Sequence, residues 1–214
     1  FSTVQSLAKA PLSSVLKEWS GLGYNHRAKL LRECAKEIVE KYDGKIPKDF
    51  AALVALPAIG PYTAGAIRAF AFDEPGIFIE TNIRTALIHH FFPKSRKVPD
   101  GKLVPILEQC QKLVSQTTYG SREWYSALMD YGAHIKKTNP NPSRRSTHHV
   151  KQSQFTGSLR QARGAILRTL VSGPANERKL HEKTPATFFK KALESLASEN
   201  MIEKKGNVWR IPQK

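Results

Sequence analysis

Apolar positions recur at helical spacing through most of the chain, whereas the alternation typical of strands is scarce before the last dozen residues. Leu30, Cys34 and Ile38, for example, fall on one face of a helix. The connections are short and most of them carry Gly or Pro, as in compact helical domains. In the first two thirds of the chain the pattern predicts helices at residues 11–19, 25–42, 49–56, 61–72, 82–92, 102–116 and 121–136.

The pattern breaks at "KKTNPNPSRRSTHHVKQSQ", which is polar, basic and rich in Pro and Ser. Such a composition predicts a linker or an irregular basic loop. Beyond it, helical patterns resume, and two short strands are expected around Lys205-Gly206-Asn207. The three helices are expected at residues 160–171, 176–184 and 186–201. Three helices followed by a hairpin make a winged-helix-like unit plausible.

The charge is strongly positive and unevenly distributed. The 214 residues carry a formal net charge of +16, and residues 136–214 hold 17 Lys and Arg against 5 Asp and Glu. This balance predicts an acidic polymer as partner, of which nucleic acid is the commonest. The alternative is a basic surface that only keeps the protein in solution.

The two cysteines, Cys34 and Cys110, lie in helix-like runs and are expected to be buried free thiols. They fit a reducing compartment, and we expect a cytoplasmic, nucleoid-associated or a nuclear protein. Nothing in the sequence resembles a signal peptide or a membrane span. Because the chain begins with Phe1 rather than Met, an N-terminal segment is expected to have been lost.

The stretch "LPAIGPYTAGAI" predicts two helices joined by a very tight turn. Pro61 suits the first position of the second helix, and Gly60 is expected to permit the chain reversal and to leave the helix end uncovered. Backbone N–H groups without partners and the helix dipole make such an end a potential phosphate site. The alternative is an ordinary helix–helix corner in the core.

These residues resemble the helix-hairpin-helix of the DNA glycosylase superfamily that includes endonuclease III. "IFIETNIRTAL" follows where that family carries its catalytic Asp, and "LKEWSGLGYNHRAKLL" is similar to the adenine-specific, MutY-like branch. The resemblance implies an all-α, two-lobed helix-hairpin-helix glycosylase fold with a small C-terminal winged-helix-like unit. Its expected domains are a glycosylase domain at residues 1–137, a basic linker at 138–156 and the C-terminal domain at 157–214.

In this family a base is flipped out of the duplex and its glycosidic bond is cut. The resemblance gives Glu80 the role of the carboxylate that stabilises the sugar cation, although the usual residue is Asp; its alternative role is a helix N-cap near Thr81 and Asn82. Tyr62 occupies the position where lyase members carry a Schiff-base Lys, which implies a monofunctional enzyme in which Tyr62 lines the pocket. The alternative for Tyr62 is an ordinary half-buried aromatic.

The family's general acid lies upstream of the segment that matches Phe1. Either that segment has been lost, or the protein lacks its acid. The family's iron–sulfur cluster is held through C-x6-C-x2-C-x5-C, and those four positions fall here on Lys136, Ser143, Ser146 and Gln152. None of these side chains replaces a cluster thiolate, so we predict no cluster, no metal site and no cofactor.

Other DNA contacts are expected outside the catalytic pair. Tyr24 matches the first of a Tyr pair common in the branch, and is either a wedge in DNA or a packed loop aromatic. The full set of expected DNA-binding residues is Ile59, Gly60, Tyr62, Tyr24, Lys136, Lys137, Arg144 and Arg145.

The sequence therefore predicts a monomeric DNA repair glycosylase that hydrolyses the bond to adenine mispaired with guanine or oxoguanine. Its expected partner is double-stranded DNA with a mispaired or damaged base, and it is not expected to bind a membrane. The rival hypothesis is a non-catalytic DNA-binding protein that keeps the fold.

Overall fold

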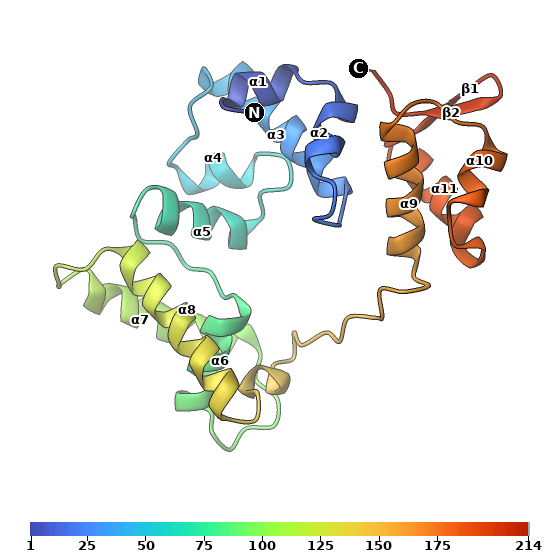
Figure 1. Cartoon of the computed structure of the whole chain (residues 1–214). Coiled ribbons are helices and arrows are strands. Elements are labelled where there is room, and N and C mark those ends of the chain that lie inside the picture. The colour runs from blue at the N-terminus through green and yellow to red at the C-terminus, as the bar shows by residue number, and fades with distance from the viewer. Residues whose placement is uncertain (214) are drawn as a thin grey trace. The chain divides into compact units, whose positions relative to one another are not determined.

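A computed structural model describes residues 1–213 and is mostly helical in that range, with one two-stranded hairpin (Figure 1). Within the described residues, no helix is both long and apolar enough to cross a membrane. The chain forms two compact units. One contains residues 1–46, 56–58 and 152–213, and the other contains residues 47–55 and 59–151.

The first unit joins the N-terminal helices α1 (Val4–Lys9), α2 (Leu12–Glu18) and α3 (His26–Tyr42) to the C-terminal part of the chain. That part comprises α9 (Leu159–Val171), α10 (Glu177–Glu182), α11 (Phe189–Ser198) and the strands β1 (Glu203–Lys205) and β2 (Val208–Arg210). The antiparallel strands pair Lys204 with Trp209, and Trp209 also bridges to Ala175 ahead of α10. The predicted three helices and hairpin are thus confirmed.

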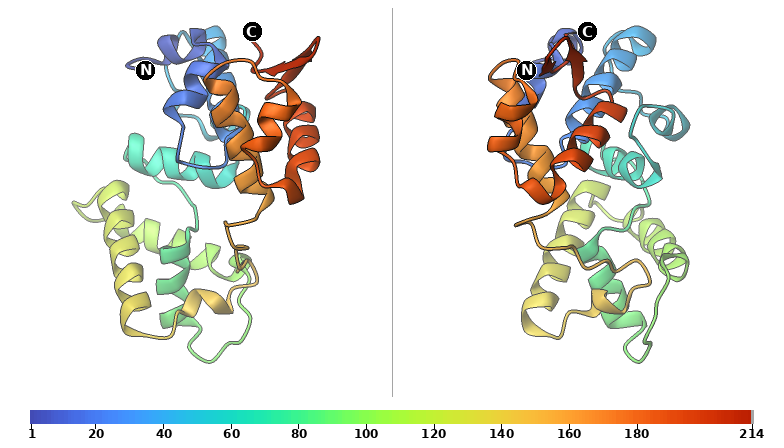
Figure 2. Two further views of the ribbon diagram at one scale, coloured as in Figure 1. Left: turned by 45° about the vertical axis from the view of Figure 1, so that its right-hand side comes forward. Right: turned by 90° about the vertical axis from the view of Figure 1, so that its right-hand side faces the viewer.

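One continuous apolar core holds this unit together, and α2 packs against α9 (Figure 2). Leu12, Val15 and Leu16 of α2 are buried in the same cluster as Ile166 and Leu170 of α9. Because the burial of apolar side chains is the main favourable term in folding, this shared core fixes the C-terminal helices on the N-terminal ones.

A polar clamp reinforces that contact. The Glu199 carboxylate, just beyond α11, accepts two hydrogen bonds from Arg163 of α9 at 2.7 and 2.6 Å. The carboxylate also lies 3.0 Å from Nδ1 of His26. The ammonium of Lys29 donates to the backbone carbonyl of Glu199 at 2.6 Å. Hydrogen bonding from Arg163 holds the pKa of Glu199 below its usual range, against an opposing effect of burial.

The second unit contains α4 (Phe50–Val54), α5 (Pro61–Ala71), α6 (Thr81–Phe91), α7 (Val104–Val114) and α8 (Ser121–Thr138). Ile83, Ile88, Leu107 and Tyr125 are fully buried in its core. Helices α6 and α8 approach closely at Gly132, where an added Cβ would lie only 2.0 Å from the carbonyl oxygen of Asn82. The core therefore fixes the start of α6, where the candidate chemistry is found.

The helices expected from periodicity are present, with ends that differ by a few residues. Periodicity missed α1, which is six residues long and is started by a capping box between Thr3 and Ser6. It also missed a short 3-10 helix at Pro142–Arg145, inside the expected linker. That segment is fixed locally, because Val98 and Ser146 form a bridge and Val98 donates to the Arg145 carbonyl at 2.9 Å. The domain boundaries expected from the sequence remain a prediction.

Candidate functional site

Glu80 is the N-cap of α6. Its backbone is extended, and its Oε1 atom accepts hydrogen bonds from the backbone N–H groups of Asn82 and Ile83, the latter at 3.0 Å. These are two of the donors that every helix start leaves without intrahelical partners. Among residues 1–213, the other oxygen, Oε2, accepts no hydrogen bond and is not one of the buried unpartnered atoms. The carboxylate is therefore held by one oxygen while the other stays accessible.

Tyr62, in the first turn of α5, lies in the same unit as Glu80. Its side chain is 50% exposed and its ring meets Phe78 edge-on, with the centroids 5.7 Å apart. Partial burial raises the pKa of Tyr62; the negative charge of Glu80 raises it further, and Arg84 opposes both. The phenol thus stays protonated and lies within the electrostatic reach of the Glu80 carboxylate.

Lys136, near the end of α8, faces the start of α6. Its Nζ donates to Oδ1 of Asn82 at 2.5 Å. Burial holds the pKa of Lys136 below its usual value. The negative charge of Glu80 opposes this effect, and the positive charge of Arg84 adds to it. A chain of contacts therefore runs from the Lys136 ammonium through the Asn82 side chain and backbone to the Glu80 carboxylate, and the site combines an anchored anion with a half-buried cation.

Two arginines near the site have structural partners. Arg84 forms a two-pronged ion pair with Asp100, at 2.8 and 2.7 Å. Arg145 donates to the carbonyls of Phe92 and Pro93, both at 2.7 Å, and so caps the C-terminal end of α6. Because these carbonyls already engage the Arg145 guanidinium, it is less free for a phosphate than the expectation from the sequence implied.

The tight turn before α5 differs from expectation in one respect. Gly60 has φ −84°, which any residue adopts, so it is not the residue that permits the chain reversal. Ala58 takes the left-handed conformation instead, with φ 59°. A Cβ placed on Gly60 would meet no atom within 4 Å, so the space in front of the helix is open.

The backbone N–H groups at this turn have no partners. Within residues 1–213, no hydrogen bond is formed by the N–H groups of Gly60, Tyr62 or Thr63, and no side chain caps α5. Ile59 and Gly60 are half-buried. Unpaired amide donors facing open space at the positive end of a helix are the arrangement that binds phosphate oxygens.

The remaining expected DNA contacts fall in different places. Lys137 and Arg144 are exposed in the same unit as Glu80. Tyr24 belongs to the other unit, where it is 55% exposed and has φ 49°. The Arg27 guanidinium lies 4.9 Å above its ring, and the Gln152 amide donates to its hydroxyl. Glu80, Tyr62 and Lys136 therefore share one unit, and Tyr24 belongs to the other.

Three of the positions that the resemblance aligns with cluster thiolates have hydrogen-bond partners within the protein. Lys136 binds Asn82, the Ser143 hydroxyl donates to Asn141 at 2.8 Å, and Ser146 accepts from the His148 N–H at 3.0 Å. In the part of the chain that the structure describes, no three His, Cys, Asp or Glu side chains are grouped so as to hold a metal ion.

Comparison with known proteins places the chain in a family. Residues 1–116 match the model of the HhH-GPD superfamily base excision DNA repair proteins, so the chain belongs to that superfamily. It is 33% identical over 141 residues to an adenine DNA glycosylase of Buchnera aphidicola, a match that covers 65% of this chain and 39% of the relative. It is 35% identical over 136 residues to one of Mycolicibacterium smegmatis, covering 62% and 44%. The matches thus span about two fifths of these relatives.

A solved structure described as a thermostable thymine-DNA glycosylase aligns with 62% of this chain and 60% of its own, at 26% identity and a TM-score of 0.49.

Sequence reasoning missed the partners that support the site. The sequence marks Asn82 only as a neighbour of Glu80 and gives no signal for Asp100. A lone Asn at the second position of a helix and a lone Asp beside a Gly are common in turns. The ammonium of Lys136 contacts Asn82, and its expected contact with DNA remains a prediction.

Proposed function

We propose that this protein is a DNA glycosylase that hydrolyses the bond between deoxyribose and adenine mispaired with guanine or oxoguanine. The observation that carries the proposal is the Glu80 carboxylate, held at the start of α6 by one oxygen with the other accessible, in the same unit as Tyr62. The chain's superfamily and the relatives named adenine DNA glycosylase support it.

The proposed chemistry places a negative charge next to a developing positive one. As the glycosidic bond breaks, the sugar acquires oxocarbenium character, and a carboxylate close to the ring stabilises it. The two backbone N–H donors keep Glu80 from rotating away, so its charge needs no reorganisation during the reaction. Water is then the nucleophile, because Tyr62 has no amine with which to form a Schiff base.

The proposed anchor for the DNA is the open turn of residues 59–62. Its free N–H groups would bind a backbone phosphate, while the exposed Lys137 and Arg144 add charge attraction from the same unit. Such contacts position DNA without reading its sequence.

The test is excision from duplexes that contain A:G or A:oxoguanine, followed by gel analysis with and without hot alkali. A monofunctional glycosylase leaves an intact strand that breaks only after alkali. Strand cleavage without alkali would refute the monofunctional mechanism, and no cleavage under either condition would refute the enzyme.

A second function is a DNA-binding protein without catalysis. The observation that favours it is that Glu80 already has a complete structural role as a helix cap. In the same experiment this alternative is supported by tight binding of the mispaired duplex with no strand breakage after alkali.

A further inference from the structure

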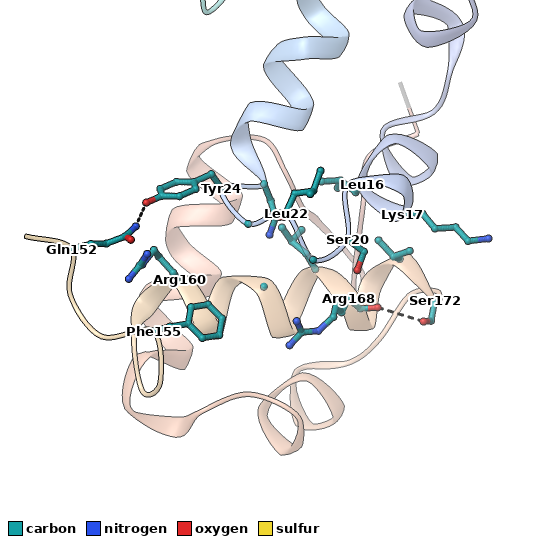
Figure 3. Close-up of a pocket in the computed structure, with 16 residues that line it drawn as sticks. Leu16, Lys17, Ser20, Leu22, Tyr24, Gln152, Phe155, Arg160, Arg168 and Ser172 are labelled. Carbon is teal, nitrogen blue, oxygen red and sulfur yellow. Dashed lines mark hydrogen bonds between the residues drawn. The ribbon is translucent and has the colours of Figure 1, made fainter. Parts of the chain in front are cut away.

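A groove in the first unit is lined by residues of that unit alone, and neither Glu80 nor Tyr62 contributes to it. It is formed by α2, the loop of residues 20–25 and α9, and has a volume of about 710 Å³ (Figure 3). Leu16 and Leu167 contribute buried apolar surface to it, while Gly164 keeps one face of α9 free of a side chain. This volume lies in the range of sites that enclose small organic ligands.

The charged side chains that line the groove are all basic. Lys17, Arg160 and Arg168 border it, and no Asp or Glu does. Among residues 1–213 none of these three cations has a carboxylate within ion-pairing distance. Arg160 donates a hydrogen bond to the Ser153 carbonyl at 2.7 Å, which leaves its positive charge uncompensated. Cations without an ion-pair partner provide charge complementarity to an anionic ligand.

The cationic lining continues past the groove. Arg168 also borders a second hollow of about 340 Å³, together with Lys179 and Lys183. This hollow too has no carboxylate in its lining. The basic surface is therefore longer than one phosphate group and fits a chain of phosphates better than a single small anion.

The rim of the groove bears exposed apolar side chains. Leu22 is 65% exposed, Phe155 is 57% exposed and Tyr24 is 55% exposed. In Figure 3, Phe155 and Arg160 lie beside each other at one end of the groove, and Leu22 extends from the loop over α9. An aromatic face next to an arginine that forms no ion pair suits a base and the phosphate attached to it.

The geometry points to a binding site for a short unpaired stretch of DNA, with its phosphates on Arg160, Arg168 and Lys17 and a base stacked on Phe155. Proteins that bind single strands combine these features: a positively charged groove along the backbone and aromatic side chains for the bases. A duplex keeps its bases stacked on one another and offers none to Phe155. The inference rests on the proposed function only in taking DNA as the polymer.

The test is fluorescence anisotropy with a labelled oligothymidylate of about 12 nucleotides and an abasic sugar–phosphate oligomer of the same length. The variants are Arg168→Ala, Phe155→Ala and, as a matched control, Arg178→Ala. Arg178 is an exposed arginine on α10 of the same unit and pairs with Glu182. Phe155 is largely exposed, so its replacement leaves the thermal unfolding temperature unchanged, which circular dichroism verifies.

Phe155→Ala should weaken binding of oligothymidylate about tenfold and leave binding of the abasic oligomer unchanged, because only the former offers a base. Arg168→Ala should weaken both, and should lower the slope of log affinity against log salt by about 0.7. Arg178→Ala should change neither.

Equal effects of Phe155→Ala on the two oligomers, or none on either, would overturn the stacking site. Equal effects of Arg168→Ala and Arg178→Ala would show attraction by net charge alone and overturn the groove. Displacement of oligothymidylate by poly-glutamate as effectively as by unlabelled DNA would make the ligand an acidic peptide and likewise overturn it. Because no base excision is measured, these outcomes are independent of whether wild-type protein cuts an A:G duplex.

Discussion

Replacing Glu80 by Gln removes the negative charge but keeps an oxygen that can cap α6. At a separation of ~4 Å and an effective dielectric of ~20, the attraction between a carboxylate and a sugar cation amounts to about 4 kcal/mol. At 1.36 kcal/mol per factor of ten, its loss should slow excision roughly 1,000-fold. The free energy of unfolding should fall by less than about 1 kcal/mol, because only the charge–dipole attraction is lost.

Comparison with Glu80→Ala separates catalysis from folding. Alanine removes both the charge and the hydrogen bonds from the Asn82 and Ile83 N–H groups. The excision rate should therefore again fall roughly 1,000-fold, and the free energy of unfolding should fall by about 1 kcal/mol. Glu123→Gln is the matched control, because Glu123 is an exposed acid in the first turn of α8. It removes a charge at a helix start without touching the site.

The assay is single-turnover excision with enzyme in excess over an A:G duplex, combined with urea unfolding of each variant. Excision by Glu80→Gln within threefold of wild type would refute the electrostatic role. If Glu123→Gln lost as much activity as Glu80→Gln, the loss would depend on the net charge of the protein and not on a charge at the site.

Three further predictions concern stability. Ala58→Gly should raise the melting temperature measured by circular dichroism by a few degrees, because glycine relieves a left-handed cost of about 1–2 kcal/mol against a smaller entropic loss; no gain would mean that the turn is not strained. Gly132→Ala should lower the free energy of unfolding in urea by about 3 kcal/mol, since its Cβ would clash with the Asn82 carbonyl, and a neutral effect would contradict the close approach of α6 and α8. Glu199→Gln should lower the free energy of unfolding by about 2 kcal/mol at pH 7, because it weakens the hydrogen bonds from Arg163. Between pH 7 and pH 3 the free energy of unfolding of this variant should fall less steeply than that of the wild type, which gives a flatter acid limb. The sign follows from the lowered pKa of Glu199: its contribution is present above the unfolded pKa of about 4.3 and is lost as the pH falls through the folded value, so an unchanged acid limb would contradict the clamp.

The helices and their order were predictable from the sequence because they depend on local spacing. Pro61 begins α5 as expected, since a proline at the first helical position loses no hydrogen bond. The short α1 was missed, because six residues carry too little periodicity to be recognised. The sequence predicts that Gly60 permits the chain reversal, but Ala58 adopts the positive φ, because which residue of a tight turn does so depends on how both helices leave it.

The sequence by itself determined the family, through motifs whose residues are adjacent in the chain, and it placed Glu80 at the beginning of a helix. Only the tertiary structure decided what surrounds that carboxylate. Lys136 lies 54 positions beyond Asn82, and the packing of α8 on α6 makes them neighbours. In the same way, α9 meets α2 through a shared apolar core and so forms the basic groove. Such pairings depend on which apolar faces are buried together, and local spacing carries no information on that choice.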